Sequence, residues 1–339
     1  MNDDVIFKIR NLTCRYIDNN PDELLNINKL NLDQEYVEKL LGKKIAKLDF
    51  NNRQKLLNVL NEKQSLSSDD REKDPIIRNW KQVDSLVKRL SPQLKISKLD
   101  IYRNKLTMIV GRSGCGKSTL LETLGLMNKT FDDNSQITFY PFGLKGKNFD
   151  YQQLWKKENR KKIADVRRKY LSFIFQRTNL MPNFKNKENA CISNLLHGDS
   201  LKNSEYDAKL FGDSVKMEKN WLDKYPNQLS GGQQQRIAFI RAILPKYSVL
   251  FGDEPTGNLD EKTSEDVMNN VREKGVSSVI VTHNIDLALK YSDQIIFLEP
   301  NGINIEPKIF NSVQNGGGRV WKNWSRSNLK KELNNLMNR

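Results

Sequence analysis

The sequence contains few of the residues that build disulfide frameworks or metal clusters. Its 339 residues include three cysteines, Cys14, Cys115 and Cys191, which are scattered without the paired spacing of a zinc site. No stretch approaches the length and apolarity of a transmembrane helix, and the acidic start at residues 1–4 has no signal-peptide pattern. No internal repeat is present. These absences argue against a disulfide-stapled secreted module and favour a reducing, cytoplasmic location.

Acidic residues are fewer than basic residues. The chain has 56 Lys and Arg residues against 41 Asp and Glu residues, a formal net charge of +15, and its mean hydropathy is -0.68. Such an excess is compatible with nucleic acid, an anionic membrane surface or an acidic partner, and also with simple solvation of the surface. The length is sufficient for one large α/β core and a smaller subdomain.

One glycine-rich segment lies in the context that a phosphate-binding P-loop requires. The apolar run 106–110 precedes it and the helical pattern 120–124 follows it. The segment reads Gly111-Arg112-Ser113-Gly114-Cys115-Gly116-Lys117-Ser118-Thr119. Its glycines allow backbone N–H groups to converge on an anion, Lys117 can reach the β- and γ-phosphates, and the Ser118 hydroxyl can hold Mg²⁺. The alternative, a turn that binds nothing, is disfavoured by the flanking strand and helix.

Hydrophobic periodicity outlines the rest of the chain. Apolar runs and alternating patterns predict strands at 5–16, 94–101, 106–110, 136–140, 171–175, 249–251, 278–281, 294–298 and near 303–305. Helical spacing predicts two to four amphipathic helices within 21–92, a very basic helical stretch over 151–169, helices within 186–224, and a long helix from Ser230 to about Leu244. The alternation of short apolar runs with helices indicates a parallel sheet covered on both faces.

Two further motifs bear on phosphate chemistry. The strand at 249–251 leads to Asp253 and Glu254, of which one carboxylate can hold Mg²⁺ and the next can polarise an attacking water. The segment Leu229-Ser230-Gly231-Gly232-Gln233 begins a helix and offers a second phosphate-binding surface, an ordinary capped helix being the alternative. Because one ATP needs only one P-loop, this second surface suggests two chains that exchange surfaces across a dimer.

The order of these motifs resembles that of ATP-binding cassette (ABC) ATPases. The motifs are the P-loop, Gln176, the segment 229–233, Asp253-Glu254-Pro255, Asn258-Leu259-Asp260 and Thr282-His283. The resemblance covers residues 1–18 and 93–308, and the segments 173–177 and 253–260 look most like the group serving lipoprotein release, macrolide export and cell division. It implies an α/β P-loop NTPase fold, with a mixed sheet core, an antiparallel β subdomain, and an α-helical signature subdomain within 170–245.

The resemblance also implies roles for individual residues. Lys117, Gln176, Glu254 and His283 match the catalytic positions, Glu254 as the base and His283 as the switch histidine at the γ-phosphate. Ser118, Gln176 and Asp253 match the magnesium ligands, and Gln176 also senses the transport partner. The other residues that the resemblance assigns to nucleotide binding are the rest of the P-loop at 111–119, the signature residues Ser230, Gly231, Gly232 and Gln233, and Asp260 at the dimer seam. Of the signature residues, Ser230 and Gly232 match those that contact the γ-phosphate bound to the other protomer.

Three features depart from the family pattern. The adenine-stacking aromatic fits Tyr16 by its local sequence, but a predicted helical insertion at 19–92 separates it from the P-loop; if the insertion does not loop out, Tyr102 or nothing fills the role. The insertion itself is either an embellishment packed on its host or a partner-docking element. The basic tail at 309–339, with a hinge at Gly316-Gly317-Gly318, predicts contact with anionic lipid or nucleic acid.

The favoured interpretation is an ATP-binding and ATP-hydrolysing subunit of an ABC transporter-type complex. Two copies would close around two ATP molecules with Mg²⁺ and drive a separately encoded transmembrane protein from the inner face of the cell membrane. The alternative is a soluble ABC ATPase in nucleic-acid, translation or phage-defence processes, to which the charge, the insertion and the tail point. A non-catalytic scaffold is disfavoured because Glu254 and His283 are both present.

Overall fold

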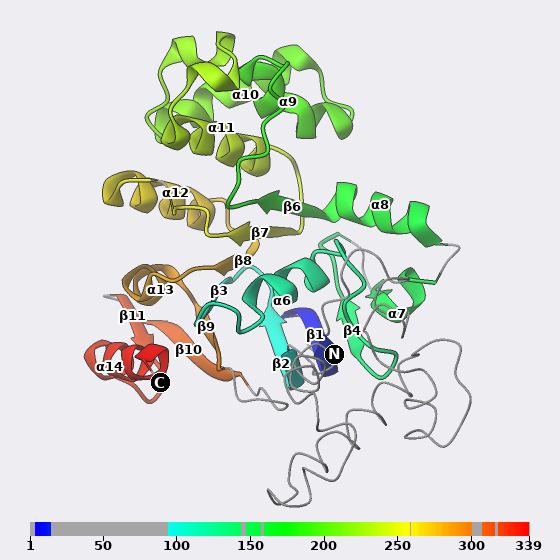
Figure 1. The fold of residues 1–339 in the computed structure, drawn as a ribbon, viewed down its shortest axis with the longest axis vertical. Coiled ribbons are helices and arrows are strands. Elements are labelled where there is room, and N and C mark those ends of the chain that lie inside the picture. The colour runs from blue at the N-terminus through cyan, green and yellow to red at the C-terminus, as the bar shows by residue number, and fades with distance from the viewer. Residues whose placement is uncertain are drawn as a thin grey trace, which may run out of the picture.

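The computed structural model describes residues 4–14, 94–143, 147–156, 159–257, 259–299, 307–315 and 318–338. The expected helices of the insertion, Tyr16, Asn258 and the strand expected near 303–305 lie outside these ranges. Two sheets and the helices that flank them make up the described part of the chain (Figure 1).

The larger sheet has seven strands in the order β11-β10-β9-β3-β8-β7-β6. Their bounds are β3 (Leu106–Gly111), β6 (Leu171–Ile174), β7 (Val249–Asp253), β8 (Ser277–Val281), β9 (Gln294–Leu298), β10 (Lys308–Asn315) and β11 (Gly318–Trp321). Strands β9, β3, β8, β7 and β6 run parallel, whereas β10 and β11 are antiparallel additions. Every residue of β3, β8 and β9 is buried, which confirms the apolar runs as central strands of a sheet covered on both faces.

The smaller sheet is antiparallel, in the order β2-β1-β4-β5. Its strands are β1 (Val5–Cys14), β2 (Leu94–Tyr102), β4 (Gln136–Phe139) and β5 (Phe149–Asp150). Phe7 of β1 stacks on Phe139 of β4 with ring centroids 4.8 Å apart, so aromatic side chains join these two neighbouring strands. Cys14, the last residue of β1, pairs directly with Leu94, the first residue of β2. Residues 15–93 therefore connect two neighbouring positions of this sheet.

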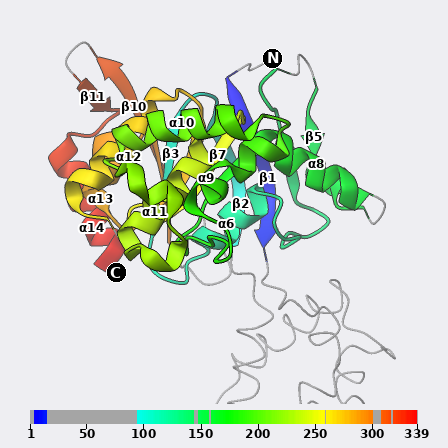
Figure 2. The same cartoon turned by 90° about the horizontal axis from the view of Figure 1, so that it is seen from above.

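The helices form three groups around the sheets (Figures 1 and 2). Their bounds are α6 (Lys117–Leu124), α7 (Tyr151–Leu154), α8 (Arg160–Tyr170), α9 (Asn186–Leu196), α10 (Leu201–Ser214), α11 (Gly231–Ile243), α12 (Glu261–Glu273), α13 (Ile285–Tyr291) and α14 (Arg326–Asn338), with short 3-10 turns at Lys219–Asp223 and Pro226–Gln228. Helices α9, α10 and α11 form a layer beyond β6 and β7, α8 extends to one side, and α12, α13 and α14 lie on the opposite side.

The long helix expected from Ser230 is confirmed as α11. Ser230 caps it, because its hydroxyl accepts from the Gln233 N–H at 3.3 Å while the Gln233 side chain accepts from the Ser230 N–H at 2.9 Å. This reciprocal pair satisfies two backbone donors at the helix start. The cap therefore fixes where the glycines of the segment 229–233 lie.

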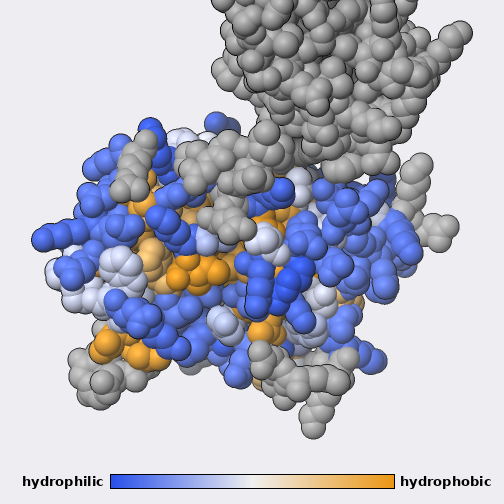
Figure 3. All heavy atoms as spheres, turned by 90° about the horizontal axis from the view of Figure 1, so that it is seen from below, coloured by the Kyte–Doolittle hydropathy of each residue, from blue (hydrophilic) through white to orange (hydrophobic). Residues whose placement is uncertain are grey.

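The surface is as polar as the composition predicts. Figure 3 shows one face covered mainly by hydrophilic side chains with hydrophobic patches between them. None of the described helices is long and apolar enough to cross a membrane.

The sequence predicts a basic tail at 309–339 without assigning it regular structure, and the structure gives this segment strands and a helix. Gly318 begins β11, which pairs with β10 and extends the large sheet. Helix α14 follows and packs against α13 through a stripe of buried leucines, Leu329, Leu333 and Leu336. These residues recur at the helical spacing of an apolar face, which abundant Lys and Asn residues obscure in the sequence. The tail is therefore folded onto the core.

Leu333→Ala tests this packing. Leu333 is fully buried, so we expect a loss of about 2–5 kcal/mol in the free energy of unfolding, as for other buried leucines. Lys331→Ala, on the exposed side of the same helix, is the matched control and should change the free energy by less than about 0.5 kcal/mol. Urea unfolding followed by tryptophan fluorescence measures both. Equal, negligible effects would show that α14 is not part of the folded unit.

Candidate nucleotide site

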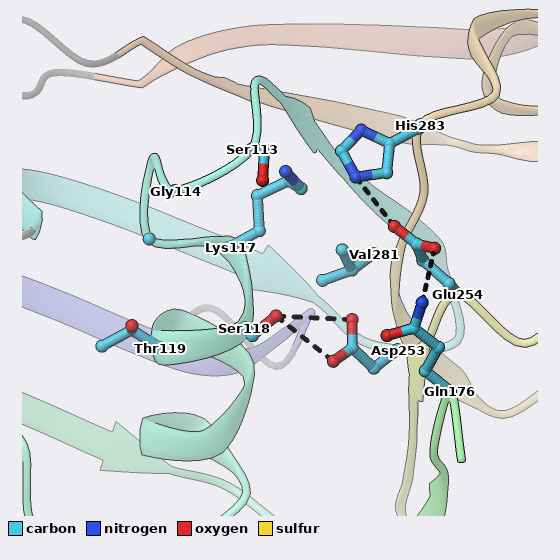
Figure 4. Close-up of a pocket in the computed structure, with 11 residues that line it drawn as sticks. Ser113, Gly114, Lys117, Ser118, Thr119, Gln176, Asp253, Glu254, Val281 and His283 are labelled. Atoms are coloured by element: carbon cyan, nitrogen blue, oxygen red, sulfur yellow. Dashed lines mark hydrogen bonds and ion pairs between the residues drawn. The ribbon is translucent and has the colours of Figure 1, made fainter. Parts of the chain in front are cut away.

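A cavity of about 510 Å³ lies at the carboxyl edge of the large sheet (Figure 4). The residues that line it are Ser113, Gly114, Gly116, Lys117, Ser118, Thr119, Gln176, Asp253, Glu254, Val281 and His283. They follow or end β3, β6, β7 and β8, and because these strands are parallel neighbours their carboxyl ends meet at one edge. The fold thus brings together the P-loop, the glutamine, the acidic pair and the histidine that sequence motifs single out.

The P-loop depends on glycine at defined positions. Gly114 and Gly116 have φ angles of 78° and 96°, in the left-handed region that side chains disfavour, and Gly116 directly precedes α6. A Cβ on Gly111 would lie 2.5 Å from the backbone oxygen of Leu298, so a side chain there would clash with β9. The loop can therefore curl closely between the sheet and the helix N-terminus, where an anion is favoured.

Lys117 is the cation of the cavity. Its ammonium donates to the backbone oxygens of Gly111 at 2.9 Å and Arg112 at 2.7 Å, and the residue is 6% exposed. Burial lowers the pKa of Lys117, and its neighbours, including the carboxylates of Glu254 and Asp253, act in the opposite direction. A buried ammonium held by neutral carbonyls gains strongly from an added anion, which is what a phosphate would supply.

Oxygen donors gather opposite the lysine. The Ser118 hydroxyl lies 3.2 Å from one carboxylate oxygen of Asp253 and 3.5 Å from the other. Figure 4 shows the amide of Gln176 between the carboxylates of Asp253 and Glu254. Hydroxyl, carboxylate and amide oxygens are the hard donors that Mg²⁺ prefers, so these three side chains fit that ion.

Glu254 is held at both carboxylate oxygens. One lies 2.8 Å from Nε2 of His283, and the other accepts from the Gln176 amide at 3.4 Å. The backbone at Glu254 adopts a φ of 48°, uncommon for a residue with a side chain, and its N–H donates to the Val281 oxygen at 3.0 Å. The strained turn after β7 therefore aims this carboxylate into the cavity.

Other predicted residues lie elsewhere. Gly111, Arg112 and Cys115 belong to the P-loop but do not line the cavity, and burial raises the pKa of the Cys115 thiol. Ser230, Gly231, Gly232 and Gln233 form the start of α11, where Ser230 and Gly231 are exposed. None of these four lines the cavity. Asp260 caps α12, and hydrogen bonds from Thr263 lower its pKa.

Two further residues contribute to the site, and they were not identified from the sequence. Val281 ends β8 and lines the cavity, and its position directly before Thr282-His283 is the signal that could have identified it. Gln235 is buried in α11 and donates to the Pro255 oxygen at 3.1 Å. This bond connects α11 to the turn that carries Glu254, so each segment helps to fix the position of the other.

Comparison with known proteins points to one family. The ABC transporter family model matches residues 94–257. The lipoprotein-releasing system ATP-binding protein LolD of Rickettsia typhi is 36% identical over 234 residues, covering 68% of this chain and 95% of that protein. LolD of Zymomonas mobilis is 35% identical over 204 residues, covering 59% and 82%.

A solved structure matches as well. The ABC transporter cassette MJ0796 of Methanocaldococcus jannaschii, solved as a dimer, aligns with a TM-score of 0.55 and 29% identity over 64% of this chain and 89% of that chain. A second structure of MJ0796, bound to ADP and phosphate in a post-hydrolysis state, matches with the same TM-score. The chain therefore belongs to the ABC transporter family and is an ATPase of the ATP-binding cassette type.

Proposed function

We propose that this chain binds ATP with Mg²⁺ in the cavity around Lys117, hydrolyses it, and thereby drives a separate membrane protein. The observation that carries the proposal is the placement of Lys117, the Ser118–Asp253 pair and the anchored Glu254 around one cavity of about 510 Å³. That combination supplies a phosphate cation, metal-binding oxygens and a base within one site.

The chemistry assigns each side chain a task. Lys117 and the N–H groups of the loop bind the β- and γ-phosphates, and Glu254 accepts a proton from the water that attacks the γ-phosphorus. His283 holds the carboxylate of Glu254 in position and faces the same cavity. When bound by Ser118, Asp253 and Gln176, Mg²⁺ would neutralise charge on the phosphates.

A second copy would complete the site. Ser230 and Gly231 are exposed at the start of α11 and do not line the cavity of their own chain, although a helix start with glycines suits a phosphate. We infer that Ser230 and Gly231 bind the γ-phosphate of an ATP molecule held by the P-loop of another copy. The dimeric state of the similar cassette MJ0796 supports this arrangement.

The membrane partner is expected to dock beside β6. A second cavity of about 590 Å³ has a mainly apolar lining that includes Phe173, Phe175 and Leu196, and Arg167 and Arg168 of α8 also line it. We call it the β6 groove. An apolar lining with arginines among it fits a helical segment that carries apolar and acidic side chains, and we propose that the membrane partner supplies it.

The groove is coupled to the nucleotide site through consecutive residues. Phe175 lines the groove, and Gln176, the next residue, lines the nucleotide cavity and donates to Glu254. Arg241 of α11 braces the following segment through the carbonyl oxygens of Thr178 at 2.7 Å and Asn179 at 2.9 Å. A displacement of Phe175 in the groove would therefore move Gln176, the next residue, and with it the hydrogen bond to the carboxylate of Glu254.

The proposal places the protein at the inner face of a membrane. The alternative, a soluble ATPase in nucleic-acid or defence processes, is not favoured, since the relatives are transporter subunits. The roles of the 19–92 insertion, of Tyr16 and of an anionic surface for the tail stay predictions.

Lys117→Ala should weaken ATP binding by roughly 10- to 100-fold, because a charged hydrogen-bond donor to phosphate contributes about 1.5–3 kcal/mol. Titration with a fluorescent ATP analogue measures the effect. Lys129→Ala is the matched control, since Lys129 is exposed and outside the cavity, and it should bind like the unmodified chain. Unchanged affinity in Lys117→Ala would contradict the phosphate assignment.

Glu254→Gln should separate binding from turnover. The amide keeps the shape of the carboxylate but cannot accept the proton, so the hydrolysis rate should fall by about 10²–10⁴-fold while ATP affinity is retained. Steady-state phosphate release and the same binding titration measure the two quantities. Glu273→Gln at the exposed end of α12 serves as the control. A Glu254→Gln protein that turns over at the unmodified rate would exclude Glu254 as the base.

A further inference from the structure

Helix α8 carries a concentration of positive charge that ATP hydrolysis does not use. Its basic residues are Arg160, Lys161, Lys162, Arg167, Arg168 and Lys169, against one acidic residue, Asp165. Among the described residues, the ion pair that involves this helix joins Arg168 and Asp165 at 3.6 Å. Most of the cationic charge of α8 is thus not neutralised by the described part of the chain.

The remaining side of α8 is buried. Ile163, Val166 and Tyr170 pack into the core beside the small sheet, while Arg160, Lys161 and Lys162 are exposed. The helix projects from the side of the molecule in Figures 1 and 2. Its solvent-facing surface is therefore mainly cationic, with Ala164 and Asp165 as the exceptions, and its packing does not require those charges.

The placement of the cations at the start of α8 works against the helix. Lys161 and Lys162 lie in its first turn, which contains no acidic residue, and Asn159 makes no side-chain cap. Positive charge at a helix N-terminus opposes the helix dipole, whereas Arg167, Arg168 and Lys169 in the last turn favour it. The first-turn cations therefore do not serve helix stability, and a bound anion would offset their cost.

The cationic surface is continuous with the β6 groove. Ala164, Arg167 and Arg168 line the groove. Residues three and four apart share a helix face, so Arg160 and Lys161 extend this lining toward the start of α8. The resulting strip, from Arg160 to Arg168, is about 12 Å long at the helical rise of 1.5 Å per residue. We call it the α8 strip.

We propose that the α8 strip binds, through Arg160 and Lys161 beyond the groove, the acidic phospholipid headgroups of the membrane in which the partner is embedded. The proposal rests on the proposed function, because it takes the β6 groove as the docking place of a membrane protein. A partner seated in the groove brings the bilayer surface toward the helix that borders it, and clustered Lys and Arg residues bind anionic headgroups. The proposed partner in the adjoining groove favours lipid over nucleic acid at the strip, because that partner holds the chain at a bilayer surface.

The test uses the full chain and phosphatidylcholine vesicles with about 30% phosphatidylglycerol, which supply the negative surface potential that attracts basic segments. Co-sedimentation should show binding that weakens as salt is raised, and no binding to pure phosphatidylcholine vesicles. The double variant Arg160→Gln/Lys161→Gln should bind about 25-fold more weakly, at about 5-fold per removed charge. It should stay folded, with an unchanged or higher Tm, since it removes first-turn cations from a helix start.

The matched control is Lys322→Gln/Lys331→Gln, which removes two exposed charges from the tail. If the α8 strip and not the basic tail holds the headgroups, this control should bind the acidic vesicles like the unmodified chain. Loss of binding in this control with retention in the α8 variant would assign lipid binding to the tail and overturn the proposal. So would an unmodified chain that ignores acidic vesicles but retards a DNA duplex in a gel.

ATP hydrolysis by the same proteins separates this inference from the proposed function. The α8 variant should hydrolyse ATP at the unmodified rate without vesicles, because Arg160 and Lys161 do not line the nucleotide cavity. Vesicle binding that depends on the α8 strip in a chain without ATPase activity would refute the proposed hydrolysis and still support the strip. ATPase activity with vesicle binding that is indifferent to the α8 charges would refute the strip alone.

Discussion

The parallel pairing of β3, β8 and β7 determines the geometry of the nucleotide site. Val281 lies opposite Ile109 on one side and opposite Asp253 on the other, so one residue aligns the end of the P-loop strand with the acidic end of β7. A slip of one residue would turn every side chain to the opposite face of the sheet. The contact of Glu254 with His283 and the approach of Ser118 to Asp253 both depend on this register.

The sequence was sufficient to predict the components that follow single strands. Apolar runs that lead to Gly111, to Gln176 and to Asp253-Glu254 identified β3, β6 and β7, and parallel strands necessarily present their carboxyl ends at one edge. The left-handed backbone of Glu254 could not be predicted in this way, nor could the bond from its N–H to Val281, which lies on a different strand. The same holds for Gln235, whose partner lies on a separate segment.

Patterns diluted by polar residues were harder to interpret. The three leucines of α14 are separated by Lys, Glu and Asn residues, so the tail was expected to be a basic extension, and only packing on α13 identifies its apolar face. The β6 groove could not be predicted either, because α8, β6, α9 and α11 each contribute part of its lining. The charge of α8 was evident in the sequence, whereas its continuity with the groove required the fold.

The nucleotide cavity, the β6 groove and the α8 strip are linked through one short stretch of chain. Helix α8 leads without a loop into β6, which ends just before Phe175 and Gln176; Phe175 lines the groove, and Gln176 donates to the carboxylate of Glu254. If the proposed function holds, contacts at the membrane and changes at the phosphate act on the same strand. In the account proposed here, this strand carries the coupling between partner and ATP.

The central claim is that a working site consists of the P-loop of one copy and the start of α11 of another. A structure of the Glu254→Gln protein with ATP and Mg²⁺ tests it directly. The account predicts a two-fold dimer with two nucleotides, each having its γ-phosphate within hydrogen-bond distance of Lys117 of one copy and Ser230 of the other. A single copy that holds ATP with Ser230 remote from any phosphate would contradict it.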